Sequence, residues 1–317
     1  MIRRRTFVKR ISLAAIAATG ASGADDDEDR VPNSSGTEPP KLKAPAGACD
    51  CHHHIYDAER FPTTQPGGKL LPDARVEEYR RLQKRLGTSR SIVVTPSAYG
   101  IDNAVTLDAI VRLGRNSRGV AVVHPTVTDA ELNKLAHGGI RGIRFAITGT
   151  SSSVTTIDMI EPLAARMAAL NWHVQINMEA DQIVAAAELW NRLPCPMVFD
   201  HMGHVPQPAG VSHPVYNVIR RLVDKGNTWV KLSVTYDNTR DIPKDGAPGY
   251  ADITAVARAY VKAAPERMLW GSNWPHPNEA DKPDDAVLFD LMSQWAPDDA
   301  TRNRILVRNP ATLYGFV

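Results

Sequence analysis

The chain has 317 residues, of which 43% are hydrophobic and 23% charged, a composition typical of a folded globular protein rather than a disordered one. Its formal charge of +2, from 37 basic and 35 acidic side chains, argues against a dedicated nucleic-acid binder. No run of about 18 apolar residues occurs, so no membrane-spanning helix is expected, and three cysteines cannot form a disulfide framework.

The N-terminus has the features of a twin-arginine export signal. Arg3–Arg5 precede Phe7 and Lys9 in the order typical of such signals. A short apolar stretch, 11–18, follows, and small residues lead to an expected cleavage after Ala24. The alternative is the basic start of an ordinary helix.

Removal of residues 1–24 would leave 32 basic against 35 acidic side chains, so the apparent basicity belongs to the signal. The twin-arginine translocase carries folded proteins, so Cys49, Cys51 and Cys195 are expected to fold reduced before export to the periplasm. Residues 25–47 begin with an acidic run and contain four prolines, a composition that predicts a disordered linker.

From residue 48 onward, strand and helix patterns alternate eight times. Apolar, β-branched runs bounded by Gly or Pro are typical of buried parallel strands. We expect strands at 48–55, 91–96, 119–125, 140–147, 173–179, 196–201, 229–235 and 268–273. Amphipathic stretches predict helices near 74–87, 102–114, 128–137, 157–170, 181–193, 214–225, 252–264 and 284–296, with a last helix over 298–309.

Eight such units in about 270 residues predict a single α/β domain over 48–317, folded as a (β/α)8 TIM barrel. A doubly wound open sheet is the alternative, but no Gly-x-Gly-x-x-Gly turn follows any strand. A barrel places its chemistry at the carboxyl ends of the strands.

The first strand ends in three histidines. Because strand side chains alternate, His52 and His54 face one way and His53 the other. Two adjacent imidazoles at a barrel mouth can hold a metal ion or exchange protons with a substrate. The alternative is a solvated histidine cluster.

Polar residues also follow the sixth and eighth strands. Asp200 and His201 come directly after apolar residues, where either a catalytic pair or a histidine satisfied by its neighbour is expected. Asn273 lies between two tryptophans at the end of the eighth strand, and its alternative role is to stabilise a turn.

Two arginines of the fourth strand, Arg141 and Arg144, are three residues apart and therefore face opposite ways. Arg144 is nearer the carboxyl end, so we expect it to bind a carboxylate or sulfonate, or else to form an ion pair inside the barrel. Further candidate substrate contacts are Ser97, Lys231, Tyr236 and His276. Weaker candidates are Tyr99, Gln175, Asn177 and Asp237.

Three motifs together resemble the amidohydrolase superfamily. They are Asp-Cys-His-His-His from Asp50, Phe-Asp-His-Met-Gly from Phe199 and Trp-Gly-Ser-Asn-Trp-Pro-His from Trp270. They are similar to the lactone-processing branch of amidohydrolase-related family 2, which includes 2-pyrone-4,6-dicarboxylate lactonase, sulfomuconolactone hydrolase and D-galactarolactone isomerase. The resemblance runs from about residue 48 to the C-terminus and implies a metallo-dependent hydrolase-like barrel.

The resemblance also implies a set of site residues. The His-x-His pair of the family falls on His52 and His54, and its histidine of the sixth strand falls on His201. An aspartate that activates water in the hydrolases falls on Asn273, which cannot serve as a general base. Because this carboxylate is missing, the resemblance implies either no cofactor or one Zn²⁺ held by the three histidines.

The expected activity is opening of a small anionic lactone, of the muconolactone or sulfomuconolactone type, in aromatic catabolism. His201 or His54 would activate water, Asn273 would position it, and His52 or a Zn²⁺ would stabilise the oxyanion. Arg144 would hold the anionic group of the substrate. The alternatives are a sugar-acid lactone isomerase, which Asn273 favours and His52 disfavours, and an exported barrel that only binds its ligand.

Overall fold

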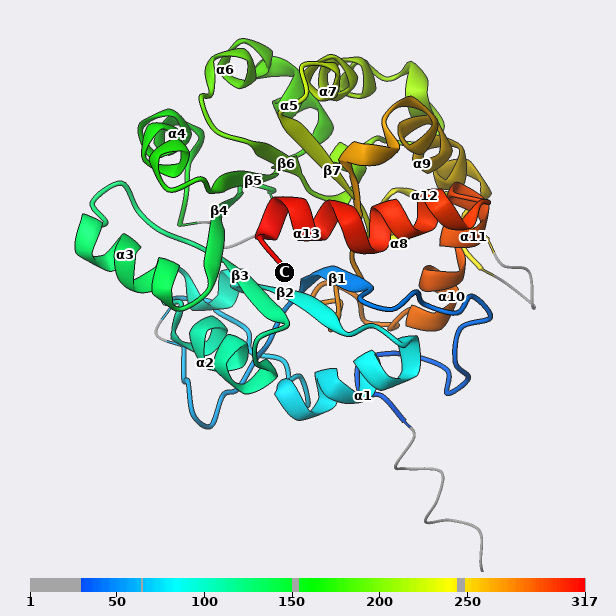
Figure 1. Cartoon of the computed structure of the whole chain (residues 1–317), viewed down its shortest axis with the longest axis horizontal. Helices are drawn as coiled ribbons and strands as arrows, with labels where there is room; N and C mark the ends of the chain where they lie inside the picture. Colours follow the sequence, from blue (N-terminus) through cyan, green and yellow to red (C-terminus); the bar gives the residue numbers. More distant parts are fainter. Residues whose placement is uncertain (1–29, 64, 150–153, 244–248, 317) are drawn as a thin grey trace, which may run out of the picture. The chain divides into compact units, whose positions relative to one another are not determined.

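Eight short strands form the centre of the computed structural model, which describes residues 30–63, 65–149, 154–243 and 249–316 (Figure 1). They pair in parallel in chain order, which confirms the predicted barrel. Their bounds are β1 Cys49–His53, β2 Arg90–Val94, β3 Ser117–Ala121, β4 Ile140–Ala146, β5 His173–Asn177, β6 Met197–Phe199, β7 Thr228–Leu232 and β8 Met268–Trp270. Each predicted strand extends past the observed carboxyl end, and after most of the strands the chain stays buried for one or more residues once pairing stops.

Helices surround the strands (Figure 1). Their bounds are α1 Val76–Leu86, α2 Ala104–Leu113, α3 Asp129–His137, α4 Ile160–Ala169, α5 Ala180–Ala185, α6 Ala187–Arg192, α7 Pro214–Asp224, α8 Thr235–Asn238, α9 Ala251–Ala263, α10 Asp285–Asp290, α11 Met292–Trp295, α12 Asp299–Asn303 and α13 Asn309–Tyr314. The helices predicted over 181–193 and 284–296 are each divided in two, and a π-helical turn over 304–308 separates α12 from α13. Within the described ranges, no helix is both long and apolar enough to cross a membrane.

One buried carboxylate bridges the seam between β1 and β8. Asp50 accepts hydrogen bonds from the backbone N–H of His52 (3.1 Å) and from the N–H and hydroxyl of Ser272 (2.9 and 2.6 Å). A backbone bond from Asn273 N–H to the His52 carbonyl (2.7 Å) continues the seam. Gly271 permits this approach, since a Cβ there would lie 2.7 Å from the Cβ of His52. The seam therefore places Asn273 beside the first histidine of the pair.

The C-terminus closes the end of the barrel where the strands begin. In Figure 1, α13 crosses the centre of the strand ring. Phe316 lies against the guanidinium groups of Arg90 and Arg118, at 5.2 and 5.0 Å from its ring centroid, at the starts of β2 and β3. An apolar cluster fills the interior behind it: Cys49, Cys51, Ile92, Val94, Val120, Val198, Trp229, Leu269 and Tyr314. Access from solvent is therefore at the opposite end, where the strands finish.

The segment 31–47, which the sequence assigned to a disordered linker, instead packs on the barrel. Val31 is buried, and the indole N–H of Trp274 donates to the Pro32 carbonyl at 2.8 Å. Asp290 accepts the backbone N–H of Leu42 at 2.7 Å. The prediction was wrong here because these bonds use backbone groups, which composition does not reveal. The expected signal over 1–24 lies outside the described residues.

Candidate active site

The loops that follow β6 and β8 carry unusual backbone conformations. His201 and His204 after β6, and Asn273 and His276 after β8, all have left-handed φ angles between 49° and 64°. For non-glycine residues this conformation costs about 1–2 kcal/mol each. Such strain is typical of functional sites, where the surrounding structure fixes the positions of side chains.

The two predicted imidazoles of β1 lie side by side. The Nε2 atoms of His52 and His54 are 3.3 Å apart, and Nδ1 of His54 donates to the Val94 carbonyl at 2.8 Å. His53 points the other way and stacks on Tyr79 with ring centroids 3.5 Å apart, as strand alternation predicts. Burial, and next the charge of Arg144, lower the pKa of His54 to about 3, so this imidazole is neutral at physiological pH.

A buried carboxylate, Asp200, organises the charges beneath these rings. Its Oδ2 accepts hydrogen bonds from Arg144 Nε (2.9 Å) and Gln175 Nε2 (3.0 Å). Its Oδ1 lies 3.3 Å from His52 Nδ1 and 3.5 Å from Lys231 Nζ. Burial raises the pKa of Asp200. Lys231, His52 and Arg144 together lower it by more than burial raises it, so the net pKa is well below its usual range. Asp200 is therefore ionised.

Lys231 fixes the tautomers of the β1 pair. Its ammonium lies 3.2 Å from His52 Nδ1 and donates to Gln175 Oε1 at 2.7 Å. A lysine ammonium carries only donors, so in its contact with Lys231 His52 Nδ1 accepts, even though Asp200 Oδ1 also lies 3.3 Å from this nitrogen. In this tautomer the proton of His52 is on Nε2. That proton faces His54 Nε2, whose lone pair is free because Nδ1 carries the hydrogen donated to the Val94 carbonyl. Both rings are thus satisfied as neutral groups.

His201 completes the imidazole group. Its ring centroid is 4.9 Å from that of His52, and its Nδ1 is 2.9 Å from the hydroxyl of Ser233. No described residue hydrogen-bonds its Nε2. Burial lowers the pKa of His201 well below its usual range, against an opposing effect of Asp200, so the ring is neutral. His201 is the imidazole of this group with a ring nitrogen not engaged by the described protein groups.

A cavity of about 260 Å³ opens beside these groups at the carboxyl ends of the strands. His54, Ser97, Arg144 and Asn177 line it, together with Lys69 from the loop after β1. Arg141 bonds backbone carbonyls on the other side of its strand, as its spacing from Arg144 predicts. The cavity is of a size for a small organic molecule, and two cationic side chains on its wall suit an anion.

Three predicted substrate contacts do not line this cavity. The Lys231 side chain is fully buried among the groups of Asp200, because its β7 position points into the barrel interior. His276 is also fully buried, bonded to Tyr236 (2.9 Å) and to Asp285 (3.1 Å). Tyr236 in turn accepts a hydrogen bond from Asn273 Nδ2 at 2.8 Å. The sequence predicted that Lys231 and His276 contact the substrate. Their burial and contacts correct this prediction, because both side chains support other residues of the site.

The four weaker candidates also lie in different places, some at the site and some away from it. Gln175 belongs to the Asp200 group and Asn177 to the cavity wall. Tyr99 accepts a backbone N–H from residue 57 at 3.1 Å, and Asp237 is exposed.

The sequence did not predict that Asp200 is the central charge of the site or that Lys69 lines the cavity. Asp200 had a signal, because a charged residue directly after an apolar strand lies at a barrel mouth. Lys69 had none, since it comes from a loop without periodicity.

A divalent metal ion would find a different donor set from the three histidines expected. Nitrogen and oxygen atoms of His52, Asp200 and His201 lie within 4.8 Å of one another, and Asp200 Oδ1 has no hydrogen-bond partner among the described residues. Two imidazoles and a carboxylate are a suitable set for Zn²⁺, so these residues fit one ion. Such an ion, when bound, would polarise a carbonyl oxygen or a water molecule.

The sequence of this chain is similar to those of known proteins. The family model described as amidohydrolase matches residues 49–316. The chain is 34% identical to 4-sulfomuconolactone hydrolase of Rhizobium radiobacter (88% of this chain, 93% of the relative), and 36% identical to 2-pyrone-4,6-dicarboxylate hydrolase of Comamonas testosteroni (87% and 92%). It is 32% identical to D-galactarolactone isomerase of Agrobacterium fabrum (88% and 94%).

A solved structure agrees. The ligand-free crystal structure of an Agrobacterium tumefaciens protein superposes with a TM-score of 0.80 at 30% identity, covering 90% of this chain and 99% of that one. The resemblance carried by the histidine and tryptophan motifs is thus confirmed over nearly the whole described chain. The chain belongs to the amidohydrolase family.

Proposed function

We propose that this protein is a lactone hydrolase that opens a small anionic lactone of the muconolactone or sulfomuconolactone type. The observation that carries the proposal is the cavity in which Arg144 lies beside a neutral imidazole, His54, at the edge of the three-histidine group. The relatives named as hydrolases of a sulfomuconolactone and a pyrone dicarboxylate support this substrate class.

The cavity wall supplies what an anionic lactone needs for binding. The guanidinium of Arg144 suits a carboxylate or sulfonate, and Lys69 adds a second positive charge. Ser97 is a hydroxyl donor for the lactone carbonyl oxygen. His52, expected to stabilise the oxyanion, is fully buried and bonded on both nitrogens, so that part falls to the groups on the wall.

His201 does not line the cavity itself, but it is the proton acceptor in this proposal because no described residue hydrogen-bonds its Nε2. If its Nδ1–H donates to Ser233, its Nε2 presents a lone pair. The water oxygen attacks the lactone carbonyl carbon while Nε2 takes a water proton. The ring C–O bond then breaks, and the imidazolium returns the proton to the departing ring oxygen. Lactone and water give one hydroxy acid or its tautomer, with no other reactant.

Single substitutions test this assignment. His201→Asn should reduce kcat on a panel of muconolactones by about 10²-fold or more, because it removes the proton acceptor. His54→Asn should reduce it as well, while His137→Asn, an exposed histidine of α3, is the matched control. Activity within a few-fold of wild type in both site variants would overturn the proposal.

A second reaction, lactone isomerisation, has one observation in its favour. Asn273 stands where the family resemblance implies an aspartate, and D-galactarolactone isomerase is among the relatives. In that reaction a substrate hydroxyl attacks the carbonyl instead of water. A third reading, capture of a lactone without turnover, would show tight calorimetric binding and no product.

We also propose export by the twin-arginine route, on the basis of the sequence around Arg4 and Arg5. Replacement of both by lysine should leave the protein in the cytoplasmic fraction, whereas the wild type is recovered from the periplasm. Equal distribution of the two forms would reject the proposal.

A further inference from the structure

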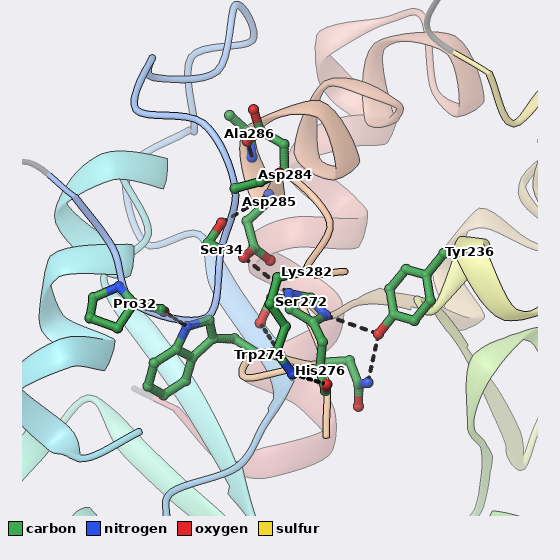
Figure 2. A network of polar contacts seen from close by, with 12 residues as sticks. Pro32, Ser34, Tyr236, Ser272, Trp274, His276, Lys282, Asp284, Asp285 and Ala286 are labelled. Carbon is green, nitrogen blue, oxygen red and sulfur yellow. Dashed lines mark hydrogen bonds and ion pairs between the residues drawn. The ribbon is translucent and has the colours of Figure 1, made fainter. Parts of the chain in front are cut away.

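A second chain of buried polar groups lies beside the imidazole group and is not used in the chemistry above. Tyr236 OH is 2.9 Å from His276 Nδ1, and His276 Nε2 is 3.1 Å from Asp285 Oδ2. Figure 2 shows Tyr236, His276 and Asp285 in this arrangement. Asn273 Nδ2 donates to the same tyrosine oxygen at 2.8 Å. The four residues, here called the Asn273 relay, come from α8, the loop after β8, and α10.

The donors and acceptors of the relay fix its polarity from one end to the other. The carboxylate oxygen of Asp285 accepts, so His276 donates from Nε2. The Nδ1 lone pair then requires the hydroxyl hydrogen of Tyr236, which leaves the tyrosine oxygen as an acceptor. The amide group of Asn273 fills that position with its Nδ2.

The polarity determines which end of the Asn273 carboxamide faces away from Tyr236. If the amide were flipped, its oxygen would face a tyrosine oxygen whose only hydrogen is already donated. The relay therefore leaves Oδ1 as the free end, and no described residue hydrogen-bonds it. Because the Asn273 N–H is bonded to the His52 carbonyl, this acceptor belongs to the residue next to the imidazole pair.

Further contacts hold the relay in place. Lys282 donates to the His276 carbonyl at 2.6 Å, and Ser34 accepts the backbone N–H of Asp285 at 3.2 Å (Figure 2). His276 and Asn273 have left-handed φ angles of 54° and 64°. A loop that keeps two strained residues and the hydrogen bonds of the relay is built to fix a side chain rather than to connect two elements.

We propose that Tyr236, His276 and Asp285 are positioning residues that orient Asn273, so that its Oδ1 accepts a hydrogen bond from the attacking water. The inference rests on the proposed lactone hydrolysis. An acceptor held in one orientation aligns the lone pair of the water toward the carbonyl carbon, which lowers the entropy cost of attack. Asn273 does not remove the proton, which goes to His201.

Tyr236→Phe is the sharpest test, because it removes the oxygen that accepts from Asn273 Nδ2 and keeps the shape of the ring. The amide of Asn273 can then flip, so its Oδ1 is no longer held in one orientation. We expect kcat about 10²-fold lower and KM within about threefold. Tyr216→Phe, at a half-buried tyrosine of α7 outside the relay, is the matched control.

The tautomer of His276 provides a readout that does not depend on activity. Nitrogen-15 NMR of histidine-labelled protein should show the neutral Nε2–H form of His276 in wild type and in both variants, because Asp285 still accepts from Nε2. The inference is overturned if His276 carries a proton on Nδ1 in wild type, or if kcat of Tyr236→Phe stays within threefold of the control. If wild type opens no lactone, the proposed function fails, while the NMR result still decides the polarity of the relay.

Discussion

The ion pair between Lys231 and Asp200 gives a quantitative test of the buried charge group. The two charged atoms are 3.5 Å apart and both side chains are fully buried. At an effective dielectric constant of about 20, this separation corresponds to an attraction of about 5 kcal/mol. Lys231→Met removes the ammonium and leaves Asp200 with Arg144 as its remaining charged partner. Breaking one side of a buried pair costs about 3–5 kcal/mol.

A double-mutant cycle separates this attraction from other effects. Asp200→Asn leaves two buried cations without an anion and should cost a similar amount. The double variant Asp200→Asn/Lys231→Met should cost about as much as either single change, giving a coupling of at least about 2 kcal/mol. Reversible urea unfolding, followed by circular dichroism, measures the four free energies. Additivity within about 0.5 kcal/mol would refute the charge arrangement described for Asp200.

Three other changes test separate parts of the structure. Arg144→Lys should raise KM for an anionic lactone about tenfold or more in steady-state assays, because the planar fork is lost; an unchanged KM would place the anion elsewhere. His173 is buried with its pKa lowered to about 3, so the unfolded chain binds the extra proton below pH 6.5 and stability is lost as pH falls from there. Between pH 7.5 and 4.5 the free energy of unfolding, measured with urea, should therefore fall by about 3 kcal/mol less for His173→Leu than for wild type. An equal fall in both would contradict the burial of His173. Trp274→Phe removes the hydrogen bond to Pro32 and should increase amide exchange in the segment 31–47; wild-type protection would show that this bond does not hold the segment.

The sequence was sufficient to predict the barrel and the meeting of its histidines. Eight apolar runs at regular spacing define the strands, and alternation within one strand separates His52 and His54 from His53. The same rule predicted that Arg141 and Arg144 face opposite ways, and the position of Arg144 nearer the carboxyl end of its strand placed it at the cavity. These predictions held because they depend only on local periodicity and on where parallel strands end.

Other parts of the site depend on pairings that no local pattern contains. Lys231 and His276 looked like substrate contacts, but their partners come from elements up to 179 residues away, which turns both side chains inward. The packing of residues 31–47 depends on backbone donors and on an indole of the β8 loop. Hydrogen-bond partners of this kind are decided by the closed barrel and not by the composition of the segment.

Incubation of the purified protein with a muconolactone in oxygen-18 water tests the central claim most directly. Mass spectrometry of the product should show one solvent oxygen in the new carboxylate for wild type, and a rate reduced by about 10²-fold for His201→Asn. A rearranged product without oxygen-18, formed at the wild-type rate, would contradict hydrolysis and establish isomerisation instead.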